Sequence, residues 1–138
     1  MDKTKQPGIN FDNVILGKLN FIRKISIPVK PELKLNINNK KSINSEAGKL
    51  VYELTGKIED EKEKSFSVEC SVIGFFSVDK EKSNMSLEDF ANANAPAILF
   101  PYFRNAVADV TMRGGLKPVI IPPLNIASMV KKDEEKQQ

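Results

Sequence analysis

The chain lacks histidine, has one cysteine and contains no long hydrophobic run. Without histidine it cannot form a His-based triad or an ordinary His/Cys zinc site, and a single cysteine excludes an internal disulfide. Cys70 has no histidine to activate it and falls in a pattern typical of a buried strand, which favours a small core side chain over a nucleophile. We therefore expect no catalytic, metal-binding or cofactor-binding residues, and an enzyme is the least favoured class.

The chain also has no large excess of basic over acidic residues. The chain has 21 basic and 18 acidic residues, a net charge of +3, and the two signs are mixed along its length. A nucleic-acid binder normally shows a basic stripe with interleaved aromatic residues, and no apolar run approaches the ~18 residues of a membrane span. Because the polar N-terminus is followed by no signal-like apolar core, the sequence predicts a cytoplasmic protein without a membrane span or a nucleic-acid partner.

The length and composition are those of a globular protein. A chain of 138 residues with 41% hydrophobic residues predicts a single domain, 1–138, that buries roughly two thirds of its unfolded surface. Within it, the polar residues 1–12 are expected to form a flexible N-terminal arm, and the charged, amide-rich residues 131–138 a disordered tail.

Four segments alternate with period two, which is typical of half-buried strands. They are predicted at residues 18–27, 33–37, 50–59 and 66–78, and the Asn- and Lys-rich residues 38–48 are predicted to form a loop. One face of the last segment begins polar and then turns apolar at Ile73 and Phe75. An apolar patch at one end of an otherwise solvent-exposed sheet face indicates that something covers it, either a partner or a part of this chain.

One long helix is predicted between Ala95 and the stop signal Gly114-Gly115, with an irregularity at Pro101. Ser86 and Asn125 are suitable N-caps for two short helices. The apolar stripe of the long helix is wide enough to cover a sheet and leave surface for another subunit. The predicted fold class is α+β: a four-stranded antiparallel sheet with one long and one or two short helices packed on one face.

Several motifs resemble the SecB family of protein-export chaperones. They are Asn-Ala-Pro-Ala-Ile-Leu-Phe-Pro-Tyr-Phe-Arg at 94–104 with its continuation to Arg113-Gly114, Pro-Leu-Asn-Ile at 123–126, and Phe-Ser-Val-Glu-Cys at 66–70 with Gly-Phe-Phe-Ser at 74–77. The resemblance covers residues 18–130 in order of elements and is closest in the second half. It indicates a divergent SecB-like member.

The resemblance implies an ATP-independent holdase that assembles as a dimer of dimers, with the helices between two sheets. It places clients in an apolar groove, which we assign to Leu33, Leu35, Ile37, Ile73 and Phe75. It also places subunit contacts on the long helix, which we assign to Leu99, Tyr102, Phe103, Ala106 and Val110. Glu69 matches one acidic contact for the translocase motor, whereas Lys24 and Pro28 stand where the family has acids. The Pro28–Pro31 connection is shorter than the family's crossover.

The partners implied are unfolded or precursor polypeptides and either the SecA translocase motor or an antitoxin. Two alternatives remain within reach of the sequence. One is a SecB-like chaperone dedicated to a single partner such as an antitoxin. The other, from a different class, is a small apolar-ligand-binding domain with a closed pocket. Alternation alone also allows Leu33, Leu35 and Ile37 to be plain sheet core.

Overall fold

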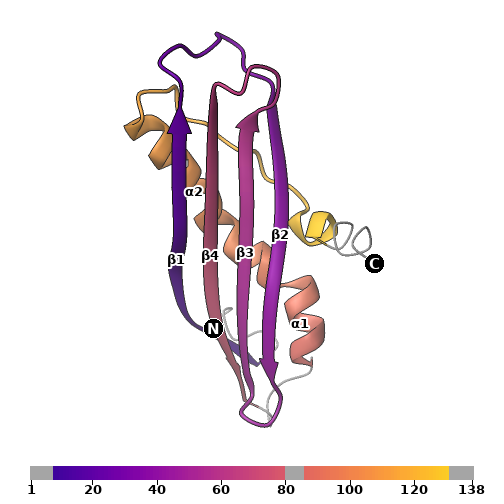
Figure 1. Ribbon diagram of the computed structural model, residues 1–138. Helices are drawn as coiled ribbons and strands as arrows, with labels where there is room; N and C mark the ends of the chain where they lie inside the picture. Colours follow the sequence, from indigo (N-terminus) through magenta and orange to yellow (C-terminus); the bar gives the residue numbers. More distant parts are fainter. Residues whose placement is uncertain (1–7, 80–85, 131–138) are drawn as a thin grey trace.

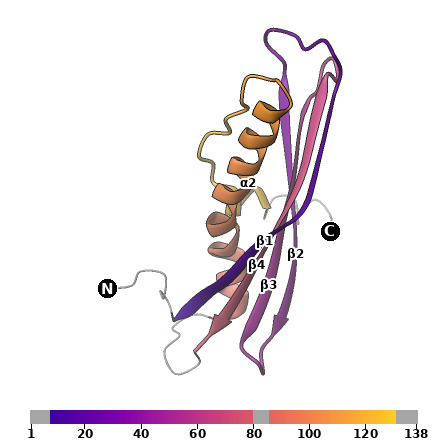
Figure 2. The ribbon, with the colours of Figure 1, turned by 90° about the vertical axis from the view of Figure 1, so that its left-hand side faces the viewer.

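The computed structural model describes residues 8–79 and 86–130. The elements along the chain are β1 (Ile9–Arg23), β2 (Leu33–Asn44), β3 (Lys49–Asp60), β4 (Phe66–Val78), α1 (Leu87–Ala93) and α2 (Ala95–Arg113). The four strands form one sheet, and both helices lie on the same face of it, as Figure 1 and Figure 2 show from two directions. The predicted α+β architecture is confirmed.

The strands are ordered β1-β4-β3-β2, and every neighbouring pair is antiparallel. Because β1 and β2 form opposite edges, residues 24–32 cross the end of the sheet from one edge to the other (Figure 1). We call these residues the crossover. Its two ends are tied to the β3–β4 hairpin by backbone hydrogen bonds, from Lys24 N to Ser65 O (2.7 Å) and from Glu61 N to Glu32 O (2.8 Å).

β1 begins earlier and ends earlier than the sequence pattern predicts. Residues 9–12, assigned to a flexible arm, belong to the strand, and Ile9 is buried opposite Val78. The rest of that arm, residues 1–7, lies outside the described residues. Register shifts at Asp12 and Gly17 reverse the alternation of side chains in the first half of β1. Because of these reversals, a search for period-two alternation does not detect this half of the strand. At the other end, β1 stops at Arg23, and Ile25 is exposed in the crossover.

The predicted loop at 38–48 is also wrong over most of its length. β2 continues to Asn44, where it pairs with Lys49, and only residues 45–48 form the turn. The second half of β2 is rich in Asn and Lys because it is an edge strand with one unpaired side facing solvent. Polar residues there discourage pairing with other chains. For this reason, composition alone predicts a loop for this half of β2.

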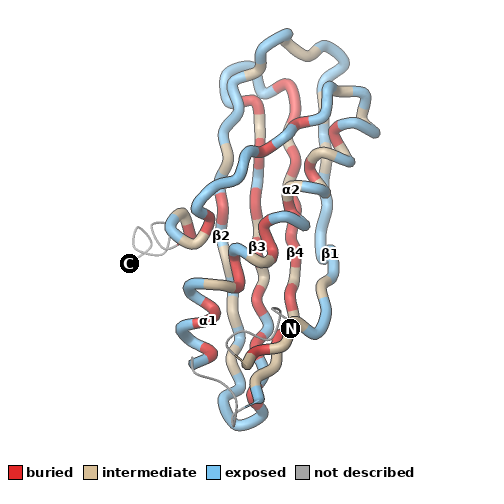
Figure 3. The backbone as a smooth tube through the Cα atoms, turned by 180° about the vertical axis from the view of Figure 1, so that it is seen from behind, coloured by how far each residue is buried: buried red, intermediate tan, exposed pale blue. Residues whose placement is uncertain are grey.

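The core lies between α2 and the helix-facing sides of β3 and β4. Tyr52 and Leu54 of β3 and Val72 of β4 meet Leu99 and Phe103 of α2, all of them buried. In Figure 3 the buried positions run along the two central strands and the inner sides of the helices, while most of β1 is exposed. Burial of this apolar surface is the main stabilising contribution to the fold.

The helix ends follow the predicted signals. The Ser86 hydroxyl accepts a hydrogen bond from Asp89 N (3.1 Å) and begins α1. α2 runs as one helix through Pro101 and ends at Gly114, after which Gly115 takes a left-handed φ of 82°. The chain then returns in an extended segment to a helical turn at 126–130 beside β2 (Figure 1), where Asn125 Oδ1 accepts from Ser128 N (3.2 Å).

Candidate functional site

An open pocket of about 470 Å³ lies at the end of the sheet where β1 ends. We call it the crossover pocket. The pocket is lined by the crossover, the adjoining ends of β1, β2 and β4, and the extended segment 115–120 that follows α2. Most of its lining is apolar, with Ile27, Pro28, Val29, Pro31, Leu33, Phe66, Leu116, Pro118, Val119 and Ile120. Such an open apolar surface is suited to holding apolar side chains of another molecule.

Several of these apolar side chains point into solvent. Val29 is 98% exposed and Ile120 is 73% exposed, whereas Val119 and Ile121, which flank Ile120, are buried. Sequence reasoning missed Ile120, because the three successive apolar residues Val119-Ile120-Ile121 give no alternation that would indicate which side chain is exposed. The exposed side chains keep the pocket open instead of completing the core.

Arg23 joins two walls of the crossover pocket. Its Nη1 donates to the Gly114 carbonyl (2.8 Å), while Nε and Nη2 donate to the carbonyls of Lys24 (2.8 Å) and Ile25 (2.7 Å). Gly114 caps the C-terminus of α2, where unpaired carbonyls favour a cation. Arg23 thereby fixes the start of the crossover against the end of α2. The sequence showed it only as an exception to the alternation of β1.

Asp60 fixes the other end of the crossover. Its carboxylate is buried and accepts hydrogen bonds from Ser65 Oγ (2.6 Å), Ser65 N (3.3 Å) and Glu32 N (3.2 Å). These bonds, led by the Ser65 hydroxyl, hold the pKa of Asp60 below its ordinary value although burial acts against them. Because Glu32 directly precedes β2, the carboxylate positions the pocket wall that contains Pro31 and Leu33.

The three predicted groove residues of β2 occupy different environments. Leu33 is 48% exposed and lines the crossover pocket, and Leu35 is half-buried against the core. Ile37 is only 5% exposed and belongs to the core, beneath the ring of Phe103. All three share the helix-facing side of the sheet, but Ile37 packs beside Phe103 of α2, whereas Leu33 stays exposed. Ile37 is therefore not available to a client.

Ile73 and Phe75 lie on the opposite face of the sheet. They pair across the strands with Ile15 and Asn13 of β1 and with Glu53 and Val51 of β3. Ile15 and Val51 are partly exposed, so the four apolar side chains form a patch on the face away from the helices. The structure therefore does not bring Ile73 and Phe75 together with Leu33, and the predicted groove divides into two separate surfaces.

Glu69 lies on the same outer face, in an ion pair with Lys18 of β1. The hydrogen bond and the positive charge of Lys18 hold the pKa of Glu69 below its ordinary value. The negative charge is thus largely compensated within the chain, and Lys57 of β3 stands on its other side. A role of Glu69 in docking a translocase motor stays a prediction.

The five predicted interface residues of α2 also divide. Leu99 and Phe103 are buried in the chain's own core. Tyr102 is exposed, and Ala106 and Val110 are half-buried on the side of α2 toward β1. The Tyr102 ring meets Phe11 edge to face (6.1 Å between centroids), and Gly114 contacts Phe21, so α2 lies alongside β1 between these two points.

Between the same two points β1 exposes Leu16 and Leu19, whose pairing partners Val72 and Cys70 face the helices. We call the surface formed by Leu16, Leu19, Tyr102, Ala106 and Val110 the β1–α2 surface. It retains three of the five predicted residues and adds two from a strand region whose alternation was obscured by the bulge at Gly17.

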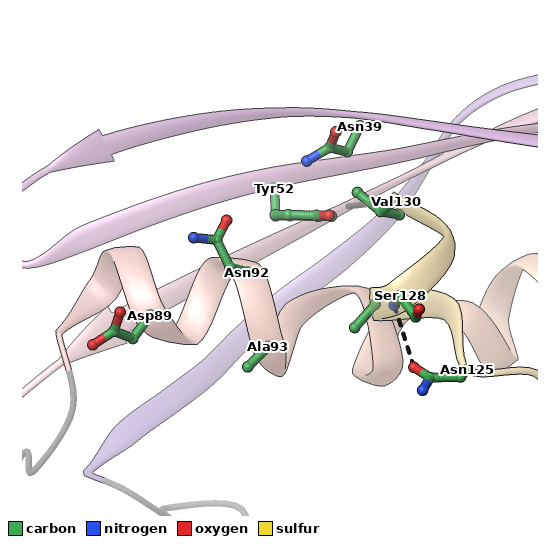
Figure 4. A pocket seen from close by; sticks show the side chains of 9 residues that line it. Asn39, Tyr52, Asp89, Asn92, Ala93, Asn125, Ser128 and Val130 are labelled. Atoms are coloured by element: carbon green, nitrogen blue, oxygen red, sulfur yellow. Dashed lines mark hydrogen bonds between the residues drawn. The ribbon is translucent and has the colours of Figure 1, made fainter. Parts of the chain in front are cut away.

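A second pocket, of about 550 Å³, lies between β2, α1 and the helical turn at 126–130 (Figure 4). Its lining is polar: Asn39, Asp89, Asn92, Asn125 and Ser128 stand beside Tyr52, Ala93, Ala127 and Val130. The Lys41 ammonium donates to the Asn92 side chain (2.6 Å) at its rim. Amide groups of this kind suit hydrogen bonding with a polypeptide, but their arrangement provides no nucleophile or base.

Reactive chemistry is not evident in the described part of the chain. Cys70 is buried, and burial raises the pKa of its thiol to about 11, so it is an inert core residue as predicted. Residues 8–79 and 86–130 contain no group of three or more acidic, Cys or His side chains placed to hold a metal ion. The helices within these ranges are also too short or too polar to span a membrane.

Comparisons with known proteins identify the family of this chain. The family model described as preprotein translocase subunit SecB matches residues 10–137. An uncharacterized protein of Methanocaldococcus jannaschii, MJ0357, is 31% identical over 98% of this chain and 90% of its own length. The protein-export protein SecB of Legionella pneumophila is 29% identical over 78% of this chain and 67% of its own length.

Among solved structures, the fold matches the SecB-like chaperone Rv1957 of Mycobacterium tuberculosis, which was solved in complex with a ChAD peptide from the HigA1 antitoxin. The TM-score is 0.72, the sequence identity is 14%, and the match covers 87% of this chain and 96% of the other. At this identity the match establishes the fold alone. Together with the family match over nearly the whole sequence, it shows that this chain belongs to the SecB family.

Proposed function

We propose that this protein is an ATP-independent holdase that binds unfolded or precursor polypeptides and keeps them competent for export. The observation that carries the proposal is the crossover pocket, where Val29, Leu33 and Ile120 expose apolar side chains around an open cavity. A soluble protein rarely leaves such side chains grouped at one site unless they meet a partner.

The energetics suit a client that binds at several points. Burying a client Leu or Phe side chain contributes roughly 1.5–3 kcal/mol, and ordering a disordered client offsets part of that gain. Micromolar binding requires about 8 kcal/mol, so one pocket does not suffice. Several pockets on one assembly would hold a client through the combined contacts. The absence of a recognisable catalytic constellation in the described residues agrees with capture without chemistry.

The assembly we propose is a homo-oligomer, a dimer of dimers, working in the cytoplasm. The β1–α2 surface is suited to the subunit contact because it combines exposed Leu16, Leu19 and Tyr102 with half-buried Ala106 and Val110. A contact there would bring two copies of the helix layer together and leave the crossover pockets at the ends of the sheets. The outer-face patch around Ile73 and Phe75 would remain outside that contact.

A second candidate function is a chaperone dedicated to one partner. It is favoured by the solved structure of the Mycobacterium tuberculosis SecB-like chaperone, which holds an antitoxin peptide. Delivery to the SecA motor is a further proposal, resting on Glu69. A carrier of a small apolar ligand is less well supported, because the crossover pocket is open rather than closed.

The test is suppression of aggregation. The purified protein, without nucleotide, is mixed with several unrelated chemically denatured proteins at near-stoichiometric ratios, and light scattering is followed on dilution. A general holdase suppresses scattering of most of them. Protection of a single natural partner supports the dedicated role, and no protection of any client contradicts both chaperone functions. Retention of a small apolar ligand would then point to the third class.

A further inference from the structure

The charged side chains that line the crossover pocket all have the same sign. They are Arg23 and Lys117, and no carboxylate is among the lining residues. The wider surroundings show a weaker bias of the same sign: residues 23–34, 114–120 and the hairpin residues 60–65 together contain seven basic residues, at positions 23, 24, 30, 34, 62, 64 and 117, and four acidic ones, at positions 32, 60, 61 and 63. The chain as a whole has 21 basic and 18 acidic residues, so this end of the molecule is more basic than the average.

Arg23 has no carboxylate partner among residues 8–79 and 86–130. The guanidinium donates to three backbone carbonyls, those of Lys24, Ile25 and Gly114, none of which is negatively charged. A guanidinium has five N–H groups, so three bonds leave two donors for another acceptor. The side chain is half-buried, which weakens the screening of its charge by water.

Two acidic groups on the neighbouring β3–β4 hairpin, Asp60 and Glu61, have partners of their own. Asp60 is bonded to Ser65 and to the Glu32 backbone, and Glu61 pairs with Lys34 (3.7 Å). Neither carboxylate lines the pocket, and neither forms an ion pair with Arg23 or Lys117. The pocket lining therefore combines apolar walls with the positive charges of Arg23 and Lys117.

We propose that the crossover pocket selects extended apolar segments that carry a carboxylate next to their apolar residues, from Asp, Glu or a chain end. This proposal rests on the holdase function proposed above and adds a substrate class to it. The apolar residues would enter beside Leu33 and Ile120, and the carboxylate would meet Arg23 and Lys117. Clients with basic flanks would be disfavoured at the same position by like-charge repulsion.

The test uses three fluorescent peptides with one shared apolar core of alternating Leu, Val and Ser. Both ends are blocked, and the core is flanked on each side by two Asp, two Ser or two Lys residues. Binding to the full chain is measured by fluorescence anisotropy at low salt and again at about 1 M salt, where the Debye length is only about 3 Å. We expect the Asp-flanked peptide to bind about tenfold more tightly than the Lys-flanked one at low salt, and within about twofold of it at high salt.

A matched pair of variants separates the pocket from the net charge. Lys117→Gln removes one charge at the pocket, whereas Lys49→Gln removes the same charge at the first residue of β3, at the far end of the sheet. Only Lys117→Gln should reduce the preference for the Asp-flanked peptide, by about threefold. Circular dichroism checks that both variants remain folded.

Each outcome bears on a different claim. Equal binding of the three peptides, tighter binding of the Lys-flanked one, or equal effects of the two variants overturns the acidic preference and leaves the holdase function standing. If none of the peptides binds even at about millimolar concentration, the affinity expected for two apolar side chains buried in one pocket, both the preference and the proposed client site are wrong.

Discussion

The ring of Phe103 lies directly on Gly56: a Cβ atom added to this glycine would stand 2.3 Å from Cζ of the ring. Phe103 is buried in the middle of α2, and Gly56 pairs with Ile37 of β2 and Cys70 of β4. The absent side chain lets α2 approach the sheet closely at this point. This contact sets how closely α2 approaches the sheet. It therefore also determines which part of the helix-facing side α2 covers.

Gly56→Ala should therefore destabilise the protein by about 1–3 kcal/mol, because the added methyl group overpacks the core. Urea unfolding followed by circular dichroism measures the change. The matched control is Gly17→Ala, where the nearest atom is the flexible end of the Ile73 side chain at 2.9 Å and can move aside. A Gly56→Ala variant as stable as the wild type would show that α2 shifts without cost.

The sequence predicted the elements better than their ends. Alternation located β3 and β4, and the cap signals at Ser86 and Asn125 are confirmed by hydrogen bonds. It located residues 18–23 of β1 but failed in the first half of that strand, where bulges at Asp12 and Gly17 reverse the faces. It also failed in the second half of β2, whose polar edge has the composition of a loop.

The candidate site was harder to predict, for a different physical reason. Alternation tells which face a residue occupies but not what covers that face along the strand. Leu33 and Ile37 have the same pattern, yet α2 covers only Ile37. Arg23 and Ile120 become neighbours of Leu33 only because the crossover and the segment after α2 meet at one end of the sheet. No local pattern contains that long-range arrangement.

The difference between Leu33 and Ile37 can be tested with the same substitution. Leu33→Asp should change the free energy of unfolding by less than about 1 kcal/mol but strongly reduce client capture, because it places a charge in the apolar lining. Ile37→Asp should cost about 4 kcal/mol or more, or prevent folding, because it buries an unpaired carboxylate. Unfolding curves and the aggregation assay measure the two effects.

Val51→Asp is the control for the charge itself, since Val51 is partly exposed on the outer face. It should leave capture unchanged. If Leu33→Asp captures clients as well as Val51→Asp does, the crossover pocket is not the client site. If Ile37→Asp folds normally, the assignment of Ile37 to the core is wrong.

The β1–α2 surface predicts how assembly responds to charge. Leu19 is 41% exposed on the helix-facing side of β1, and Ile22 is 61% exposed on the other side, where it pairs with Ser67. Leu19→Glu should convert the oligomer to smaller species, because a subunit contact would bury the charge without a partner. Ile22→Glu should leave assembly unchanged. Size-exclusion chromatography with light scattering measures the mass, and equal behaviour of the two variants would exclude this surface as the contact.

Asp60 makes the crossover sensitive to acid. Its pKa is held below the ordinary value by bonds that exist only in the folded state, so the ionised carboxylate stabilises folding above the unfolded pKa. As the pH falls through the folded pKa, the carboxylate is protonated and this stabilisation is lost. Asp60→Asn should lower stability near neutral pH and flatten the decline in stability between about pH 5 and pH 2.

Asp109→Asn is the matched control for Asp60→Asn. It removes a carboxylate from an exposed i,i+4 pair with Arg113 on α2 and should change stability by less than about 0.5 kcal/mol. Because Asp60 holds Glu32 at the start of β2, Asp60→Asn should also weaken capture at the crossover pocket, which Asp109→Asn should not. Urea unfolding at each pH and the aggregation assay give both readouts. If Asp60→Asn unfolds with the same pH profile as the wild type and captures clients equally well, the carboxylate does not position this wall.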